Sequence, residues 1–322
     1  MSGFAAVKEG LSPRAREKAM RKKHFLRLVL KYRSLYVILG IIMAYYVVFS
    51  YVPIVMGVMI SFKNLKVGMG ISAAPWVGLD NYTYIFKNPE LINVVKNTLA
   101  ISVLRLVWGF WPPILLAIFI FDITSRAYKR VCQTIVYVPY FFSWVIVYGM
   151  VFAFFSGNGF VNGIVSALGG TRYDFLTDPD LFRPMIVGSQ IWKNIGWGTI
   201  LYFAALTNVN PELYEAARVD GAGPITRIRV ITLPSIMPVI VFSLIMSIGS
   251  ILNNDFEQIL LFYNSAVYSV GDIIDTWVYR IGLGKMQYSI GSAVGLLKAI
   301  VSFVLIVMAN YFAKRLSGRG MW

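Results

Sequence analysis

The sequence predicts an all-α integral membrane protein with six transmembrane helices and one short cytoplasmic hairpin. Two observations support this fold class. Hydrophobic residues make up 57% of the 322-residue chain, and the mean hydropathy of +0.66 is unlike that of a water-soluble domain. The apolar residues also fall in runs of roughly 20, the length that a helix needs to cross a hydrocarbon core of ~30 Å. Charged residues, at 14% of the chain, separate these runs.

Six apolar runs are expected to form the membrane spans. Their approximate bounds are 35–61, 94–121, 132–155, 184–206, 235–255 and 288–313, so that residues 35–313 make one transmembrane domain. Pro112 and Pro113 are predicted to kink or break the second span, because proline lacks the N–H group that continues a helix. The apolar piece at 160–168 is too short to span and is expected to form a surface or re-entrant helix.

The basic residues predict which side of the membrane each connection faces. Of the 30 Lys and Arg residues, 19 lie in four segments that six spans place on one side, namely 1–34, 122–132, 207–234 and 314–322. The positive-inside rule makes these segments cytoplasmic, both termini included. Residues 1–34 are expected either to lie as a partly helical basic segment along the membrane surface or to form a disordered tail that only sets orientation. This clustering gives no support for nucleic-acid binding, despite a net charge of +15.

The cysteine and histidine content excludes several kinds of site. The single cysteine, Cys132, has no partner for an internal disulfide, and the single histidine, His24, lies in the basic N-terminal segment. A Cys/His metal cluster and a Ser-His catalytic triad are therefore excluded. The sequence also lacks the P-loop pattern G-x-x-x-x-G-K-[ST], so the chain is not expected to hydrolyse ATP.

The connection at 207–234, between the fourth and fifth spans, has a specific pattern. It reads E-A-A, three residues, G, nine residues, I-x-L-P, with specified positions Glu215, Ala216, Ala217, Gly221, Ile231, Leu233 and Pro234. Asn210 is expected to cap a helix that has Pro211 at its first position. Proline is tolerated there because the N–H group at that position makes no hydrogen bond within the helix. Gly221 is expected to end that helix. The simpler interpretation is a charged surface hairpin that caps the membrane bundle.

This hairpin resembles the EAA loop of permease subunits in binding-protein-dependent ABC importers, at the family's own spacing. In that family the loop is a coupling helix that docks into a groove on a separate ATPase. Small Ala216 and Ala217 permit close helix approach, and a rigid hairpin joined to a membrane helix at each end can carry motion into the bundle. The resemblance extends to 256–258, 263–268, 272–280, 286–289 and 293–296, which look like the first permease of polysaccharide-type carbohydrate importers within the maltose-type superfamily.

The resemblance implies an assembly in which this chain is a non-catalytic permease of the bacterial inner membrane. It implies a second homologous permease subunit, an ATPase dimer and an extracytoplasmic solute-binding protein. The implied substrate is an oligosaccharide, including acidic fragments of alginate or pectin. No cofactor is expected on this chain, because ATP and Mg belong to the partner ATPase. The alternative is a stand-alone secondary carrier or channel with the hairpin as a simple loop, although matched inverted repeats are not evident.

Polar residues inside the fourth span are candidates for the substrate path. Gln190, Lys193, Asn194 and Trp197 fall at i, i+3, i+4 and i+7, which is one face of a helix. Charged groups inside a bilayer are costly and usually face the bundle interior or a wet cavity. We therefore expect this face to line the path, with Lys193 favouring acidic sugars. The alternative is that Lys193 snorkels to the interface or is ion-paired.

A second polar stripe lies in the fifth span, at Ser243, Ser247, Ser250 and Asn254, next to Asn253. For the serines, hydrogen bonding within the bundle is favoured over a role in the path. Asn253 and Asn254 are candidates for the path. Arg105 and Lys298 are the other intramembrane cations, and for both we expect structural pairing with an acidic residue rather than function. Gly291 and Gly295 form G-x-x-x-G, which permits a subunit interface at the sixth span.

Overall fold

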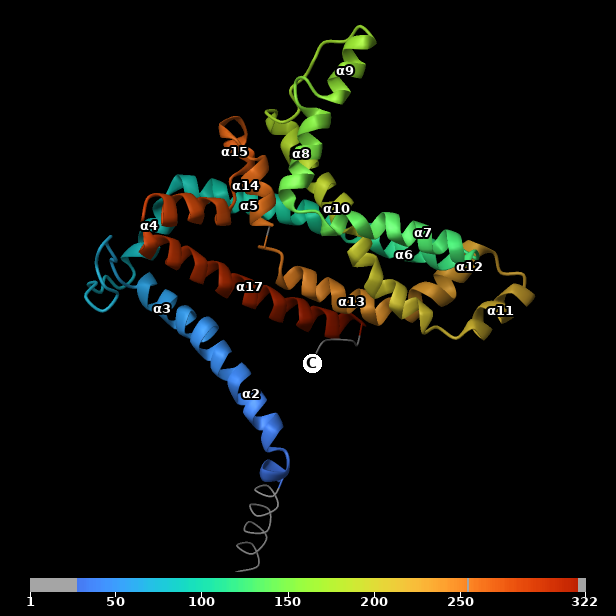
Figure 1. The fold of residues 1–322 in the computed structure, drawn as a ribbon, viewed down its shortest axis with the longest axis horizontal. Coiled ribbons are helices and arrows are strands. Elements are labelled where there is room, and N and C mark those ends of the chain that lie inside the picture. The colour runs from blue at the N-terminus through green and yellow to red at the C-terminus, as the bar shows by residue number, and fades with distance from the viewer. Residues whose placement is uncertain (1–27, 254, 318–322) are drawn as a thin grey trace, which may run out of the picture. The chain divides into compact units, whose positions relative to one another are not determined.

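The computed structural model describes residues 28–253 and 255–317, and these residues are largely helical (Figure 1). Within those ranges the chain forms no β-strand, and one isolated antiparallel bridge joins Lys63 to Trp76. The predicted all-helical class is therefore confirmed for the described residues. Five helical segments there are long and apolar enough to cross a membrane, namely Arg33–Ser61, Pro89–Asp122, Trp144–Ala167, Pro224–Gly249 and Tyr288–Arg315.

The chain divides into two compact units, and the first ends at Met59. It contains α2 (Arg33–Tyr46), the π-helical turn η2 (Val47–Tyr51) and most of α3 (Val52–Ser61). No residue of α2 or η2 is buried. An apolar helix of this kind is stable against lipid tails, because these are as apolar as leucine. Most of the predicted basic segment 1–34 lies outside the described residues, as do residues 318–322 of the predicted tail.

In the second unit, α4 (Asp80–Lys87) is followed by two helices that share the second predicted span. These are α5 (Pro89–Gly109) and α6 (Trp111–Asp122), and the helix is interrupted between them at Phe110. Pro112 and Pro113 lie in the first turn of α6, where their missing N–H groups have no intrahelical acceptor. The predicted break is therefore confirmed.

The third predicted span, 132–155, is wrong as a continuous helix. The structure has α7 (Arg126–Tyr137), a 3₁₀ turn η3 (Val138–Phe141) and then α8 (Trp144–Phe155). Pro139 lies at the start of η3 and cannot continue the hydrogen bonding of α7. Ser143 then caps α8 by accepting from the Ile146 N–H at 3.4 Å. Pro139 ends one helix and Ser143 begins the next, so both boundaries are set by residues at the boundary itself.

The short helix α9 (Phe160–Ala167) follows α8 after a turn, at the place predicted for a surface or re-entrant helix. Its buried residue Asn162 holds the loop that comes after it. The Asn162 amide donates to Ser156 O at 2.9 Å and to Tyr173 O at 2.6 Å, and its Oδ1 accepts from the Tyr173 N–H at 2.8 Å. This side chain therefore replaces the backbone partners that the loop lacks.

The central element of the second unit is α10 (Pro179–Thr207), which packs against α5, α6, η3 and α13 (Leu233–Gly249). It contains the whole of the fourth predicted span, 184–206, but it is not among the five apolar candidates. Gly196 allows α10 to approach the end of α7, since a Cβ there would lie 2.1 Å from Val136 O. This contact occupies one side of α10, so a site on this helix lies on a different side.

The predicted fifth span, 235–255, ends early, because α13 stops at Gly249. The connection 256–287, between the predicted fifth and sixth spans, contains short helical elements. These are α14 (Phe256–Phe262), η5 (Ser265–Val267), α15 (Tyr268–Gly271), α16 (Ile274–Trp277) and η6 (Val278–Gly284). The last helix, α17 (Tyr288–Ser317), covers the predicted sixth span and runs beside α13 (Figure 1).

Polar contacts tie the 256–287 segment to α5. The Arg280 guanidinium donates to the Asp272 carboxylate and lies 3.0 Å from Glu90 Oε1. Asn97 Nδ2 donates to Ser269 O at 3.0 Å and to Asp272 O at 3.2 Å. Burial raises the pKa of the Asp272 carboxyl group, against the opposing effects of its Thr276 hydrogen bond and the Arg280 charge. The 256–287 segment is therefore fixed relative to α5, one of the helices that line the cavity described next.

Candidate functional site: a polar cavity and a surface hairpin

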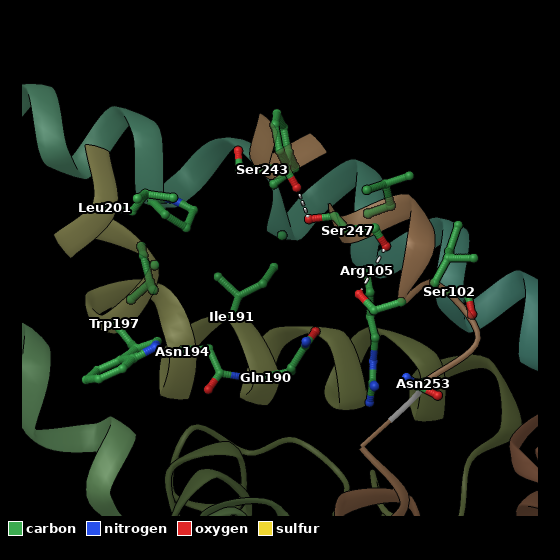
Figure 2. Close-up of a pocket in the computed structure, with 18 of the residues that line it drawn as sticks. Ser102, Arg105, Gln190, Ile191, Asn194, Trp197, Leu201, Ser243, Ser247 and Asn253 are labelled. Carbon is green, nitrogen blue, oxygen red and sulfur yellow. Dashed lines mark hydrogen bonds between the residues drawn. The ribbon is translucent and has the colours of Figure 1, made fainter. Parts of the chain in front are cut away.

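A cavity of about 430 Å³ lies between α5, α6, α10 and α13 (Figure 2). Its volume is within the range of small-molecule sites in proteins. Much of its wall is polar although the surrounding helices are apolar, and its polar residues are Ser102, Arg105, Gln190, Asn194, Tyr202, Ser243, Ser247, Ser250 and Asn253. Polar groups within a membrane bundle usually face such an interior.

The predicted face of α10 is divided between the cavity and the helix packing. Gln190, Asn194 and Trp197 line the cavity, whereas Lys193 is not among its lining residues. Figure 2 shows the three cavity residues along successive turns of α10. The expected spacing thus places these three residues at one site.

Lys193 is held by its own set of partners. Its Nζ donates to Tyr140 O at 2.7 Å and lies 5.2 Å and 5.4 Å from the ring centroids of Tyr140 and Trp144. The residue is 8% exposed. The Tyr140 ring also stacks on Trp197, with centroids 4.4 Å apart and planes at 6°. A carbonyl acceptor and two aromatic faces stabilise the ammonium group where it stands.

The serine stripe on α13 is occupied by structural hydrogen bonds. Ser247 Oγ donates to Ser243 O at 2.8 Å, and Ser250 Oγ donates to Met246 O at 3.0 Å. Ser243 Oγ also makes a 2.6 Å hydrogen bond with Tyr202 Oη on α10. These bonds agree with the structural role expected for the serines, since back-bonding of this kind satisfies a hydroxyl inside a helix. Asn253 lines the cavity, and Asn254 lies outside the described residues.

Arg105 is a cavity residue that the sequence analysis assigned to structural pairing. It projects from α5 into the wall between α10 and the turn after α13 (Figure 2). Its guanidinium donates to Gln258 Oε1, and its Nη1 lies 3.9 Å from Asp255 Oδ2. Lys298 differs, because its Nζ contacts both oxygens of Asp275 at 2.7 and 2.8 Å. The expected acidic partner is therefore confirmed for Lys298 and is distant for Arg105.

The hairpin forms a helix, a tight turn and a second helix. Its helix α11 (Pro211–Val219) is capped by Asn210, whose Oδ1 accepts from the Glu212 N–H at 3.0 Å. Gly221 has a φ of +76° and ends α11 as expected, with its N–H donating to Arg218 O at 3.1 Å. The next N–H, of Ala222, donates to Ala217 O at 2.8 Å. This is the Schellman arrangement, for which glycine is strongly preferred.

A tyrosine joins the two arms of the hairpin. Tyr214 Oη bonds Thr232 Oγ1 at 3.1 Å, and its ring lies 6.0 Å from that of Phe121 on α6. The second arm consists of α12 (Pro224–Arg227) and the π-helical turn η4 (Ile228–Thr232), which leads into α13. The hairpin is thus connected to both α6 and α13. In Figure 1, α11 lies at the end of the second unit away from α4.

The outer surface of the hairpin is exposed and partly apolar. Val219 is 88% exposed and Ile225 is 75% exposed. The motif residues are either exposed or partly covered, and none of them is fully buried. Glu215, Ala216, Gly221 and Pro234 are exposed, whereas Ala217, Ile231 and Leu233 are intermediate. Exposed apolar residues rimmed by charge are typical of a protein contact surface.

Comparison with known proteins identifies the family. Residues 109–318 match the family described as "Binding-protein-dependent transport system inner membrane component". The chain belongs to this family. The family expected from the hairpin is therefore confirmed, and this permease is a multi-pass membrane protein.

Two curated relatives come from Bacillus subtilis. Protein LplB is 44% identical over 289 residues, which cover 89% of this permease and 91% of LplB. The polygalacturonan/rhamnogalacturonan transport system permease protein YteP is 38% identical over 308 residues, which cover 95% of each chain.

Two solved structures are also similar to this permease. One chain belongs to a bacterial ABC transporter involved in the import of the acidic polysaccharide alginate. It is 39% identical with a TM-score of 0.84, and the match covers 91% of this permease and 99% of that chain. The other is from a bacterial alginate ABC transporter in complex with an alginate pentasaccharide-bound periplasmic protein, at 38% identity and the same TM-score of 0.84.

Proposed function

We propose that this permease is the membrane-spanning subunit of an ATP-driven importer of oligosaccharides, including acidic ones that contain uronate. The observation that carries the proposal is the TM-score of 0.84, at 39% identity, to a chain of an importer of the acidic polysaccharide alginate. YteP, named for polygalacturonan and rhamnogalacturonan transport, points to the same class of substrate. The cavity supports it too, because amide and hydroxyl side chains supply the donors and acceptors that sugar hydroxyl groups need.

The permease has six spans, with α10 as the fourth, and both termini are cytoplasmic. α10 has 29 residues, more than the ~20 that a span needs. Its Gln190, Asn194 and Trp197 line the cavity and its Lys193 has local partners, which is how polar groups in a membrane bundle are accommodated. These three cavity residues, with Asn253, form part of the substrate path. With the basic N-terminal segment inside, the four spans that precede the hairpin return the chain to the cytoplasm, so the hairpin is cytoplasmic.

The hairpin couples the permease to a separate ATPase. The Glu215 to Gly221 turn and the exposed Val219 and Ile225 form the docking surface, while Ile231, Leu233 and Pro234 join it to α13. Tyr214 supports this role, because its bond to Thr232 and its contact with α6 connect the surface to two membrane helices. Motion of the ATPase would therefore reach α6 and α13, which line the cavity.

The working assembly contains this permease, a second homologous permease, an ATPase dimer and a solute-binding protein, within the lipid bilayer. ATP and Mg bind to the ATPase subunits and not to this chain. The related alginate transporter, solved with its substrate-bound periplasmic protein, supports the binding-protein partner. The unburied α2 supports a lipid or second-permease contact on that helix.

Reconstitution tests the function directly. The complete assembly is placed in liposomes with ATP, and ATPase rate and uptake are measured with an alginate or galacturonate oligosaccharide bound to the solute-binding protein. We expect both rates to rise with the loaded binding protein and to be absent when the ATPase subunits are omitted. Uptake by this chain alone would instead establish a stand-alone carrier.

A further inference from the structure

We propose that Arg105 gives this permease its selectivity for anionic oligosaccharides, by binding a sugar carboxylate at the cavity wall. The inference rests on the proposed function, because it names the chemical group that the same path would recognise. Lys193, the cation expected from the helix spacing, does not take this role.

Arg105 has hydrogen-bonding capacity that the described part of the chain does not use. The residue is 8% exposed and lines the cavity. A guanidinium carries five N–H donors in a planar fork. Nη2 donates to Gln258, but the buried Nε has no acceptor among the described residues. Among the described residues Nη1 has only the 3.9 Å contact with Asp255 Oδ2, so an acceptor supplied to it by a ligand in the cavity would be favoured.

Gln258 orients the guanidinium without neutralising it. Gln258 is fully buried, and its Nε2 donates to Ile186 O at 2.8 Å and to Ser189 Oγ at 2.9 Å. Because both donor bonds go to α10, the amide oxygen is directed at Arg105. A neutral amide holds the cation in a defined position and leaves its positive charge for a ligand. A carboxylate at the same place would have cancelled that charge.

Asp255 is a weak competitor for the same cation. Its Oδ2 lies 3.9 Å from Arg105 Nη1, whereas charge-assisted hydrogen bonds are about 2.7–2.9 Å long. Its side chain is 39% exposed, so water and salt screen the contact. A ligand carboxylate that accepts two parallel N–H bonds would replace this contact with a stronger one.

The rest of the wall fits a uronate better than a simple anion. The amide side chains of Gln190, Asn194 and Asn253 line the same cavity (Figure 2). A uronate ring carries hydroxyl groups on carbons close to its carboxylate. The cavity therefore offers a guanidinium for the carboxylate, and amide and hydroxyl side chains for the hydroxyl groups.

The test compares a charged and a neutral form of one sugar. Tetragalacturonate and its methyl ester, each presented by the solute-binding protein, are taken up by the complete importer in liposomes. The readout is the ratio of acid to ester uptake in each variant relative to the unchanged chain. The preference of the binding protein cancels in this comparison. Calorimetric binding of both sugars to the purified complex without binding protein gives the same ratio independently of delivery.

Arg105→Gln should lower the ratio by about 10- to 100-fold, which corresponds to losing a charged hydrogen-bonding partner. Arg105→Lys should keep part of the preference. Asp255→Asn should improve half-saturation by the acid about two- to five-fold, because an exposed competing ion pair is lost. Lys193→Met is the matched control and should leave the ratio unchanged, since the Lys193 ammonium is held by Tyr140 O.

Equal loss of acid and ester in Arg105→Gln would overturn the inference, as would a change of ratio in Lys193→Met as large as that in Arg105→Gln. Equal calorimetric affinity of acid and ester for the unchanged complex without binding protein would overturn the inference and leave the proposed function standing. Uptake of neither sugar, with no stimulation of ATPase by the loaded binding protein, would refute both.

Discussion

Replacing Gly196 by alanine is expected to push α10 away from the end of α7. The new Cβ would lie 2.1 Å from Val136 O, 2.7 Å from Val136 C and 3.1 Å from Tyr137 Cα. These are backbone atoms, so no side-chain rotation relieves the overlap. Overpacking of a well-packed interior costs about 1–3 kcal/mol, and a backbone clash belongs near the upper value. The gain in helix propensity, about 1 kcal/mol for Gly to Ala, does not offset it.

Gly188→Ala is the matched control on the same helix, because nothing lies within 4 Å of a Cβ at Gly188. The assay is thermal unfolding of the assembled importer in detergent, followed by tryptophan fluorescence. We expect Gly196→Ala to lower the apparent Tm by roughly 5–10 °C relative to Gly188→Ala. The stacked pair Tyr140 and Trp197 should shift as well, so uptake should fall. Equal Tm values for the two variants would refute the proposed contact between α10 and α7.

Three further predictions concern the hairpin and one ion pair. Gly221→Val should reduce co-purification of the ATPase, because a φ of +76° costs a β-branched residue about 1–3 kcal/mol. Gly221→Asn should have a smaller effect, and equal co-purification of the ATPase with the two variants would contradict this prediction. Tyr214→Phe should keep the assembly but weaken substrate-stimulated ATP hydrolysis, since it loses the 3.1 Å bond to Thr232 and keeps the ring contact; an unchanged stimulation would count against it. Lys298→Met alone should lower the Tm of the complex more than the double variant Lys298→Met/Asp275→Asn does, because the single change leaves a half-buried carboxylate unpaired. A larger loss of Tm in the double variant would show that the unpaired Asp275 carboxylate is not what destabilises the single variant.

The features that could be predicted from the sequence are those decided by a few neighbouring residues. The break at Pro112 and Pro113, the cap at Asn210 and the turn at Gly221 each depend on one residue type within one helical turn. The early end of α13 at Gly249 and the division at Pro139 are harder, because hydropathy is continuous across both positions. A span read from hydropathy therefore fixes which residues are apolar and leaves open where the helix ends.

Contacts between distant residues could not be predicted in this way. The G-x-x-x-G pattern in α17 indicated a subunit interface, but a Cβ at Gly291 would meet Gly282 Cα at 3.1 Å within the same chain. Gly295 has nothing within 4 Å. Small residues allow close approach to any neighbour, so the pattern identifies a contact surface and does not identify its partner.

The three intramembrane cations show why the partner decides the role of a charge. Lys298 contacts a carboxylate at 2.7 Å, so its charge is cancelled locally. The Lys193 ammonium donates a hydrogen bond to the Tyr140 carbonyl and packs against two rings, so its charge is stabilised away from the cavity. Arg105 is oriented by a neutral amide 153 residues further along the chain, with its nearest carboxylate at 3.9 Å. Of these three cations, Arg105 is the one that lines the cavity and has no carboxylate within hydrogen-bonding distance. A substrate anion would therefore be recognised at Arg105, although helix spacing favours Lys193.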